Sequence, residues 1–247
     1  MTQAHAGSLD ESATDLLEGV LGWLADDYFR VELSGLENVP RTGPAFLIAN
    51  HSGAWALDAL VLHKVLLREL CRPVHMYASE LIFRMQPLAA YARRHEVFCD
   101  DPTVGRERLE AGHLVTVFPE GIDGVGKPFS QRYRLRPFSP GFALTAVQTG
   151  VPVLPVAIVG AEEAYPKLGE IGSLARRFAL PYFPVTTLLP LPVKWRISIG
   201  EPVSASVADG ASFAVRSAAA RRLCDEVRFT VQGMVDRDRA RRTNPFW

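Results

Sequence analysis

The chain has 247 residues, 48% of them hydrophobic, and its 27 basic residues equal its 27 acidic residues. This length allows one domain with a large core, and the neutral balance gives no overall positive charge for binding nucleic acid. The scattered Cys71, Cys99 and Cys224 predict free thiols rather than a disulfide framework or a metal site.

The N-terminal region predicts a disordered segment followed by a helix. Residues 1–8 are expected to be disordered, and Met1–Asp15 is too polar and acidic for a secretory signal. From Glu11 onward, apolar residues recur at helical spacing, namely Leu16, Leu17, Val20, Leu21 and Leu24. The helix either docks on the core or lies on a membrane, and the lack of Lys and Arg on its polar face favours the core. Tyr28–Leu33 alternates like a half-buried strand.

A histidine and an aspartate lie between the next two predicted elements. Ala45–Ala49 predicts a buried strand and Ala59–Leu70 a helix, so His51 follows a strand and Asp58 belongs to the helix. Their separation of seven residues is close to two helical turns, which would place both on one face. A carboxylate on one imidazole nitrogen makes the other nitrogen a better base. Taken alone, such a pair is more often a structural histidine and a solvated aspartate.

The middle of the chain predicts alternating strands and helices. The expected elements are a strand at Val74–Ala78, a helix at 81–94 with Pro87 near its first turn or at a kink, a strand at Glu96–Cys99, a helix at Arg106–Ala111 and a strand at Leu114–Val117. The last strand leads into Phe118-Pro119-Glu120-Gly121. The proline and the glycine hold Glu120 in a turn.

A long connection follows at residues 122–141. Within it Arg132, Arg134 and Arg136 are spaced by two, so an extended chain would place them on one side, with Lys127 nearby. They predict either an anion site for the phosphates of coenzyme A, acyl carrier protein or an acidic head group, or a solvated basic strand.

The C-terminal half predicts two strands and two helices. Phe142–Gln148 and Phe213–Arg242 are expected to be helical, and Val153–Val159 and Lys194–Ile199 to be strands. Glu162 and Glu163 either contact an acceptor or, as we expect, are carboxylates at a helix start that face its dipole. Residues 172–192 are too rich in proline for a regular helix and form either an apolar flap that meets lipid or a rigid loop. No apolar stretch is long enough to cross a bilayer, so membrane contact is expected to be peripheral.

Three motifs together resemble the glycerolipid acyltransferase superfamily. They are Asn50-His51 with Asp58, Phe118-Pro119-Glu120-Gly121, and Val151–Val156, in the order and with the separations of the lysophospholipid acyltransferase family. The resemblance covers residues 30–205. It implies an α/β fold in which a mixed, mostly parallel central sheet is flanked by helices. With the length and the amphipathic pattern, we expect one acyltransferase domain over residues 1–247 that includes a C-terminal helix at 213–242.

The resemblance also implies an activity. A fatty acyl group would move from acyl-CoA or acyl carrier protein to a hydroxyl of a lysophospholipid or acylglycerol, with no other cofactor and no metal. His51 would be the general base, Asp58 would orient it, and Glu120 with Gly121 would hold the acceptor hydroxyls. The expected partners are the thioester, the lipid acceptor and a membrane surface, and the expected location is cytoplasmic, on the inner face of the membrane.

Two departures from the family pattern bear on the acceptor. Six residues separate His51 from Asp58 where the common motif has four, which resembles the diacylglycerol-acyltransferase-like branch. Ile122-Asp123 replaces the Thr-Arg with which many members bind a phosphate on the acceptor. Either Lys127, Arg132 or Arg134 replaces that arginine, or the acceptor carries no phosphate.

Other classes of function fit parts of the same pattern. A thioester or lipid hydrolase could use His51 and water, and a lipid-binding protein could keep the motifs without catalysis. A metal hydrolase using His51, Asp58 and Glu120 is disfavoured because it would have a single histidine ligand. The chain has no Gly-x-Ser-x-Gly elbow, which argues against a serine hydrolase.

Overall fold

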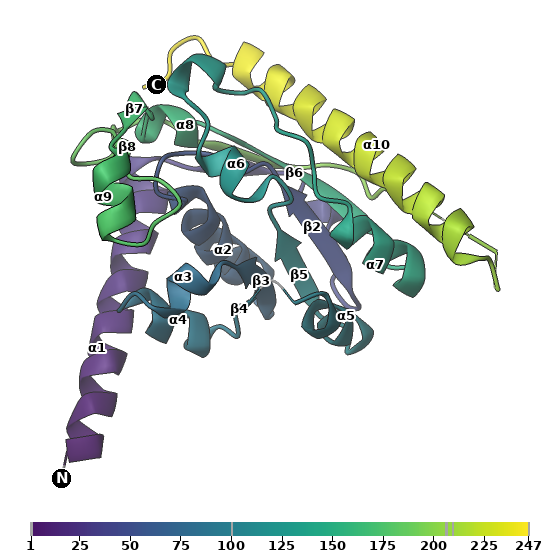
Figure 1. Ribbon diagram of the computed structural model, residues 1–247, viewed down its shortest axis with the longest axis horizontal. Helices are drawn as coiled ribbons and strands as arrows, with labels where there is room; N and C mark the ends of the chain where they lie inside the picture. Colours follow the sequence, from purple (N-terminus) through teal and green to yellow (C-terminus); the bar gives the residue numbers. More distant parts are fainter. Residues whose placement is uncertain (1, 100, 206, 209, 247) are drawn as a thin grey trace.

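In the part of the chain that the structure describes, seven strands form the central sheet, in the order β1-β9-β6-β2-β5-β3-β4 (Figure 1). The computed structural model describes residues 2–99, 101–205, 207–208 and 210–246. The strands from β6 to β4 are parallel to one another, whereas β9 is antiparallel to β6 and parallel to β1. The sheet is therefore mixed and mostly parallel, with helices on both faces, as the sequence predicted. Its strands are β1 (Glu32–Ser34), β2 (Ala45–Ala49), β3 (Val74–Ala78), β4 (Phe98–Cys99), β5 (Leu114–Val117), β6 (Val153–Val159) and β9 (Arg196–Ile199).

Helices and short turns connect these strands and continue beyond them. They are α1 (Thr2–Trp23), a π-helical turn (Leu24–Tyr28), a 3-10 turn (Leu36–Asn38), α2 (Leu57–Leu70), α3 (Glu80–Phe83), α4 (Leu88–Arg94), α5 (Pro102–Glu110), α6 (Gly121–Val125), a second 3-10 turn (Phe129–Gln131), α7 (Gly141–Thr149), α8 (Ala161–Ala164), α9 (Gly172–Arg177) and α10 (Phe213–Ala240). A small antiparallel pair, β7 (Gly169–Glu170) and β8 (Pro184–Val185), flanks α9.

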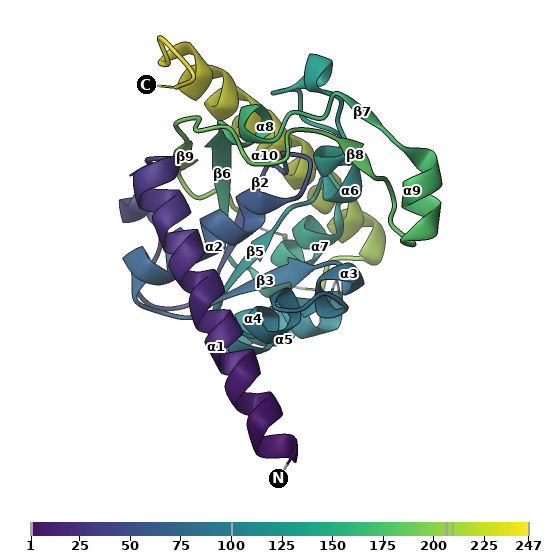
Figure 2. The same cartoon turned by 90° about the vertical axis from the view of Figure 1, so that its left-hand side faces the viewer.

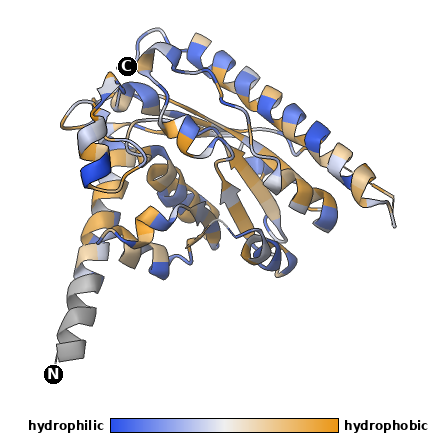
Figure 3. Ribbon diagram, in the orientation of Figure 1, coloured by the Kyte–Doolittle hydropathy of each residue, from blue (hydrophilic) through white to orange (hydrophobic). Residues whose placement is uncertain are grey.

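Alternate residues of the central strand β2 enter two separate cores. Ala45, Leu47 and Ala49 pack with α1 and α2 on one face of the sheet. Phe46 and Ile48 pack with α7 and α10 on the other. Figure 2 shows α1 and α2 in front of the strands and α10 behind them, and Figure 3 shows the hydrophobic character of the strands between these layers. A strand that is apolar at every position fits a sheet covered on both faces.

Helix α1 docks on the core along one stripe. Leu21 is buried among residues of α2 and the sheet, whereas Leu16, Val20 and Trp23 are exposed. Residues 2–8, where the sequence predicted disorder, belong to this helix, and Met1 lies outside the described residues. Within the described residues, no helix combines the length and apolar content needed to span a bilayer.

Several predicted boundaries in the N-terminal half differ from the observed ones, and two of these differences have a clear local cause. Strand β1 begins at Glu32 rather than at Tyr28, because the preceding residues form the π-helical turn, after which Phe29 stacks on Trp195 in the core. The helix predicted at 81–94 is divided into α3 and α4 at Pro87, whose ring cannot continue a helix.

The Pro-rich segment also contains a helix that the sequence did not predict. Helix α9 forms at Gly172–Arg177, before the first proline of that segment, Pro181. The rest of the segment is mainly irregular, as its prolines predicted.

Candidate active site

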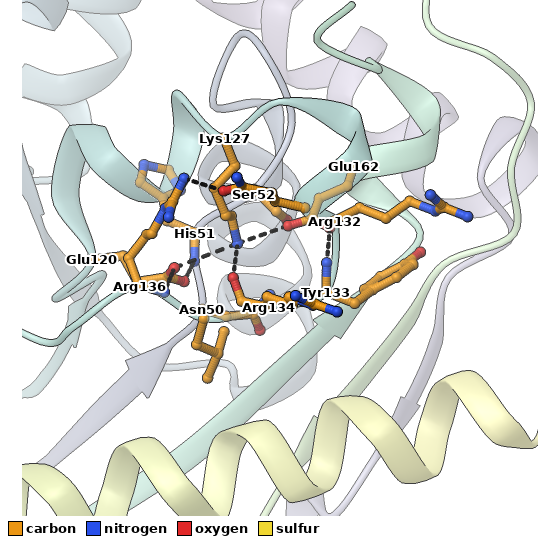
Figure 4. A network of polar contacts seen from close by, with 12 residues as sticks. Asn50, His51, Ser52, Glu120, Lys127, Arg132, Tyr133, Arg134, Arg136 and Glu162 are labelled. Carbon is orange, nitrogen blue, oxygen red and sulfur yellow. Dashed lines mark hydrogen bonds and ion pairs between the residues drawn. The ribbon is translucent and has the colours of Figure 1, made fainter.

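The candidate site lies where three neighbouring parallel strands end. Strands β6, β2 and β5 are adjacent in the sheet, and their carboxyl ends are followed by Glu162, His51 and Glu120 respectively. Ligands bind in crevices at the carboxyl ends of strands in open α/β sheets. Figure 4 shows these three residues close together, although the chain separates Glu120 from His51 by 69 residues.

The residue before the histidine joins two of these strands. The Asn50 side chain donates to the carbonyl of Ile158 at 3.0 Å and accepts from its N–H at 2.7 Å. This amide side chain extends the β2–β6 pairing beyond Ala49, the last backbone partner on β2. The backbone entering His51 is therefore anchored to β6.

His51 and Asp58 form the central contact of the site. Nδ1 of His51 lies 2.9 Å from Oδ2 of Asp58, and the two side chains are 13% and 0% exposed. A carboxylate only accepts, so Nδ1 carries the proton and Nε2 is the basic nitrogen. Asp58 is itself held by the N–H groups of Ser52, at 2.6 Å to Oδ2, and Ala59, at 2.9 Å to Oδ1.

A tight loop, not two turns of helix, brings the pair together. Helix α2 begins at Leu57, so Asp58 lies in its first turn and His51 lies before it, which corrects the expectation of one helical face. Gly53 has φ +83° and a Cβ there would lie 2.9 Å from the carbonyl oxygen of Ala161. Ala56 adopts a left-handed conformation with φ +56°, which is strained for a residue with a side chain.

The same loop is held from the C-terminal half of the chain. The N–H of Ala54 donates to the carbonyl of Tyr165 at 3.1 Å, and the Tyr182 hydroxyl donates to the carbonyl of Ala54 at 3.0 Å. Trp55 packs edge-on against Phe183, with ring centroids 5.9 Å apart. Burial raises the pKa of Tyr182, so this hydroxyl stays protonated as a donor.

The imidazole ring is packed from the β5 side. The rings of His51 and Phe118 have centroids 4.5 Å apart. Gly124 of α6 approaches so closely that a Cβ would lie 2.7 Å from Cβ of Glu120 and 2.9 Å from the His51 carbonyl oxygen. Phe118 and the close contact at Gly124 therefore restrict the position of the histidine.

Glu120 supports this arrangement from the interior. Its Oε1 accepts the N–H of His51 at 2.9 Å, and its Oε2 accepts the N–H of Arg136 at 2.6 Å. Its side chain is 0% exposed. Both carboxylate oxygens bind backbone groups, so Glu120 supports the loop of His51, and its implied role in holding acceptor hydroxyls stays a prediction. Gly121, expected to assist that role, has φ +56° and turns the chain into α6.

Lys127 is buried and paired with carboxylates, although it lines the same small pocket as Arg132. Its Nζ lies 2.8 Å from Oε1 of Glu162 and 3.4 Å from Oε2 of Glu120. Two carboxylates already balance its charge, and its expected binding of a phosphate stays a prediction. Burial raises the pKa of Glu162, and the ion pair with Lys127 opposes this shift.

The three arginines do not line one side of an extended chain. Tyr133 has φ +65°, which turns the backbone between Arg132 and Arg134. The Arg132 guanidinium lies over the Phe129 ring, Arg134 is exposed, and the Arg136 guanidinium bonds the Gln131 side chain at 2.6 Å. Figure 4 shows the three side chains spreading in different directions.

Several polar residues of the site were not assigned to it from sequence. Glu162 accepts the N–H of Tyr133, and Glu163 pairs with Arg242 at 2.7 Å, so these glutamates do not simply face a helix dipole as predicted. Arg242 follows α10 and lies 79 residues from Glu163, and no local motif links them. In the described part of the chain, no three His, Cys, Asp or Glu side chains are grouped as metal ligands.

Residues 30–159 match a family profile described as Acyltransferase. The chain belongs to this family. An uncharacterized protein of Mycobacterium tuberculosis is 38% identical to it, over 97% of this chain and 72% of that protein. A Gallus gallus protein named as a DGAT1/2-independent enzyme synthesizing storage lipids is 28% identical, over 81% of this chain and 60% of that enzyme.

The fold of this acyltransferase family member is also that of a solved structure. The 1-acyl-sn-glycerophosphate acyltransferase PlsC from Thermotoga maritima superposes with a TM-score of 0.62 and 22% identity, over 99% of this chain and 85% of that one. The family and the mostly parallel sheet that its motifs implied are thus confirmed.

Proposed function

We propose that the protein transfers a fatty acyl group from its thioester with coenzyme A or acyl carrier protein to a hydroxyl of an acylglycerol or lysophospholipid. The observation that carries this proposal is the 2.9 Å contact of His51 Nδ1 with buried Asp58, at the end of β2 in a chain of the acyltransferase family. An imidazole oriented in this way accepts a proton at Nε2.

The reaction needs one base and no nucleophile from the protein, because the thioester is already activated. The acceptor oxygen attacks the thioester carbonyl carbon while Nε2 of His51 takes the hydroxyl proton. The tetrahedral intermediate then collapses, the carbon–sulfur bond breaks, and the sulfur leaves with the proton from the imidazolium. Asp58 stabilises the imidazolium by its charge and its hydrogen bond to Nδ1.

The residues after Glu120 favour an acceptor without a phosphate. Ile122 and Asp123 lie on α6 with exposed side chains, and a carboxylate there repels a phosphate. The name of the Gallus gallus relative, an enzyme that synthesizes storage lipids, supports an acylglycerol acceptor. Arg132, which lines a small pocket beside Gly53, and the exposed Arg134 are candidates for the phosphates of the donor.

An apolar, basic surface beside the site suits a membrane. The segment at residues 166–192, which we call the α9 excursion, exposes large apolar side chains: Leu168, Ile171, Phe178, Val185, Leu188 and Leu189. Arg176 and Arg177 lie in the last turn of α9. Apolar insertion together with basic side chains suits peripheral binding to an anionic bilayer. Since Trp55 and Phe183 join the excursion to the loop after His51, this surface would bring lipid to the site.

The decisive assay offers a panel of lysophospholipids and acylglycerols with radiolabelled long-chain acyl-CoA and separates the products by chromatography. Wild type should form an acylated lipid and His51→Ala should form none. His113→Ala is the matched control. His113 precedes β5 and therefore lies at the amino end of that strand, whereas the site lies at its carboxyl end, so this replacement should leave transfer unchanged. Free fatty acid as the sole product would instead indicate a hydrolase, and full activity of His51→Ala would refute the proposal.

A further inference from the structure

The buried ammonium group of Lys127 is surrounded by acceptors. Its side chain is 3% exposed, and its Nζ lies 2.8 Å from Glu162 and 3.4 Å from Glu120. It also donates to the carbonyl of Arg134 at 3.3 Å. A lysine so deeply buried needs partners for its charge, and these three groups supply them.

Both carboxylates beside Lys127 hold backbone rather than solvent. Glu120 binds the N–H groups of His51 and Arg136. Glu162 binds the N–H of Tyr133. The segment from Tyr133 to Arg136 is therefore attached at both ends to carboxylates that share one lysine, and one of them also fixes the backbone of His51.

The network continues to the end of α10. The Tyr133 hydroxyl accepts from the N–H of Gly160 at 3.2 Å and from the Arg242 guanidinium at 3.0 Å. Arg242 also pairs with Glu163 of α8 at 2.7 Å. The loops around His51 are thereby connected through polar contacts to the C-terminal part of the chain.

We propose that Lys127 is a positioning residue for His51, acting through Glu120 and held in place by Glu162. The inference rests on the proposed function for its kinetic consequence. Two carboxylates that are buried side by side repel each other and have lost their hydration, and a cation between them offsets both costs. The lysine balances them, and the Glu120 carboxylate then holds the His51 N–H so that the ring keeps its position between Asp58 and Phe118.

The variant Lys127→Met keeps the length of the side chain and removes its charge. Its kcat should fall by about tenfold to a hundredfold, because a small displacement of the base is costly, while KM for acyl-CoA stays within about twofold. Lys127→Arg restores a cation and should recover most of kcat. Lys64→Met is the matched control, since Lys64 on α2 pairs with Glu18 and contacts neither glutamate of the network; its kcat should not change.

A second measurement is independent of activity. Hydrogen–deuterium exchange at the His51 and Arg136 amides should become at least about tenfold faster in Lys127→Met, because both donate to Glu120. The double variant Lys127→Met with Glu162→Gln removes the unbalanced charge on Glu162 and serves if the single variant fails to fold. It should still show slow turnover and fast exchange.

The outcomes separate this inference from the proposed function. If wild type transfers acyl groups and His51→Ala does not, but Lys127→Met keeps wild-type kcat and exchange, the positioning role is refuted and the function stands. A rise in KM alone would make Lys127 a substrate-binding residue and would also overturn the inference. If no acceptor is acylated by wild type, the function fails and the exchange rates alone decide the role of Lys127.

Discussion

Oδ2 of Asp58 lies 2.9 Å from Nδ1 of His51, in an environment where the aspartate has no exposed surface. The variant Asp58→Asn keeps the shape of this side chain but offers an amide that can donate to Nδ1. The imidazole would then favour the wrong tautomer, and kcat should fall by about 10²- to 10⁴-fold. Acyl-CoA assays measure the loss, and thermal unfolding checks the fold. A kcat within about twofold of wild type would show that the contact is only structural.

Gly124 offers a test of packing that removes no polar group. In Gly124→Ala the added methyl group would lie 2.7 Å from Cβ of Glu120 and 2.9 Å from the His51 carbonyl oxygen, so this backbone must move. We expect at least about a tenfold loss of kcat, because general-base catalysis depends on position. Gly141→Ala is the control, as a Cβ at Gly141 meets no atom within 4 Å. Equal kcat values in the two variants would contradict the assigned geometry.

His63, which lies outside the candidate site, should make the free energy of unfolding depend on pH. Its Nε2 donates to the Val74 carbonyl at 2.7 Å and its Nδ1 accepts from Tyr91 at 2.8 Å. Burial lowers the pKa of His63 from 6.5 to about 4. Between these two values the unfolded chain binds a proton that the folded protein does not, so the free energy of unfolding falls as pH falls, by up to about 3 kcal/mol.

Urea unfolding from pH 7 to pH 4 measures this dependence in wild type and in His63→Gln. The variant should show a shallower loss of stability over that range, even if it is less stable at pH 7. Glu18 affects stability at lower pH. Although burial raises its pKa, hydrogen bonds from His95, Arg94 and Lys64 lower it to about 2. Parallel curves for the two proteins would show that His63 is not the group responsible.

The α9 excursion predicts binding to anionic vesicles. Phe178→Ser combined with Leu188→Ser should weaken binding about tenfold or more, since each replacement removes an exposed apolar side chain. Arg176→Gln with Arg177→Gln should weaken binding most at low salt. Co-sedimentation with vesicles of phosphatidylglycerol and phosphatidylcholine measures both effects.

Phe229→Ser supplies the control for this surface. Phe229 is also largely exposed, but it lies on α10, apart from the excursion. Its replacement should leave vesicle binding unchanged. If Phe229→Ser weakens binding as much as the pair of changes in the excursion does, the membrane contacts a different surface.

The local pattern of amino acids was sufficient to predict the central strands. Strands β2, β3, β5 and β6 have the predicted bounds, because each is a mainly apolar run between turn-forming residues. The motif around His51 and Asp58 also identified the pair that the structure brings together. The strands and the identity of the pair depend on neighbouring residues, so the sequence by itself determined them, whereas the loop that joins the pair is also held from the C-terminal half.

Only the tertiary structure decided which groups surround that pair. Glu120, Lys127 and Glu162 meet because β5, β2 and β6 are adjacent in the sheet, and no local spacing encodes the order of strands. The left-handed turn at Tyr133 likewise separates arginines that an extended chain would have aligned. Side-chain partners of buried charges are set by long-range packing, which is why the sequence placed Lys127 in either an anion site or a solvated basic strand, whereas the fold pairs it with Glu120 and Glu162.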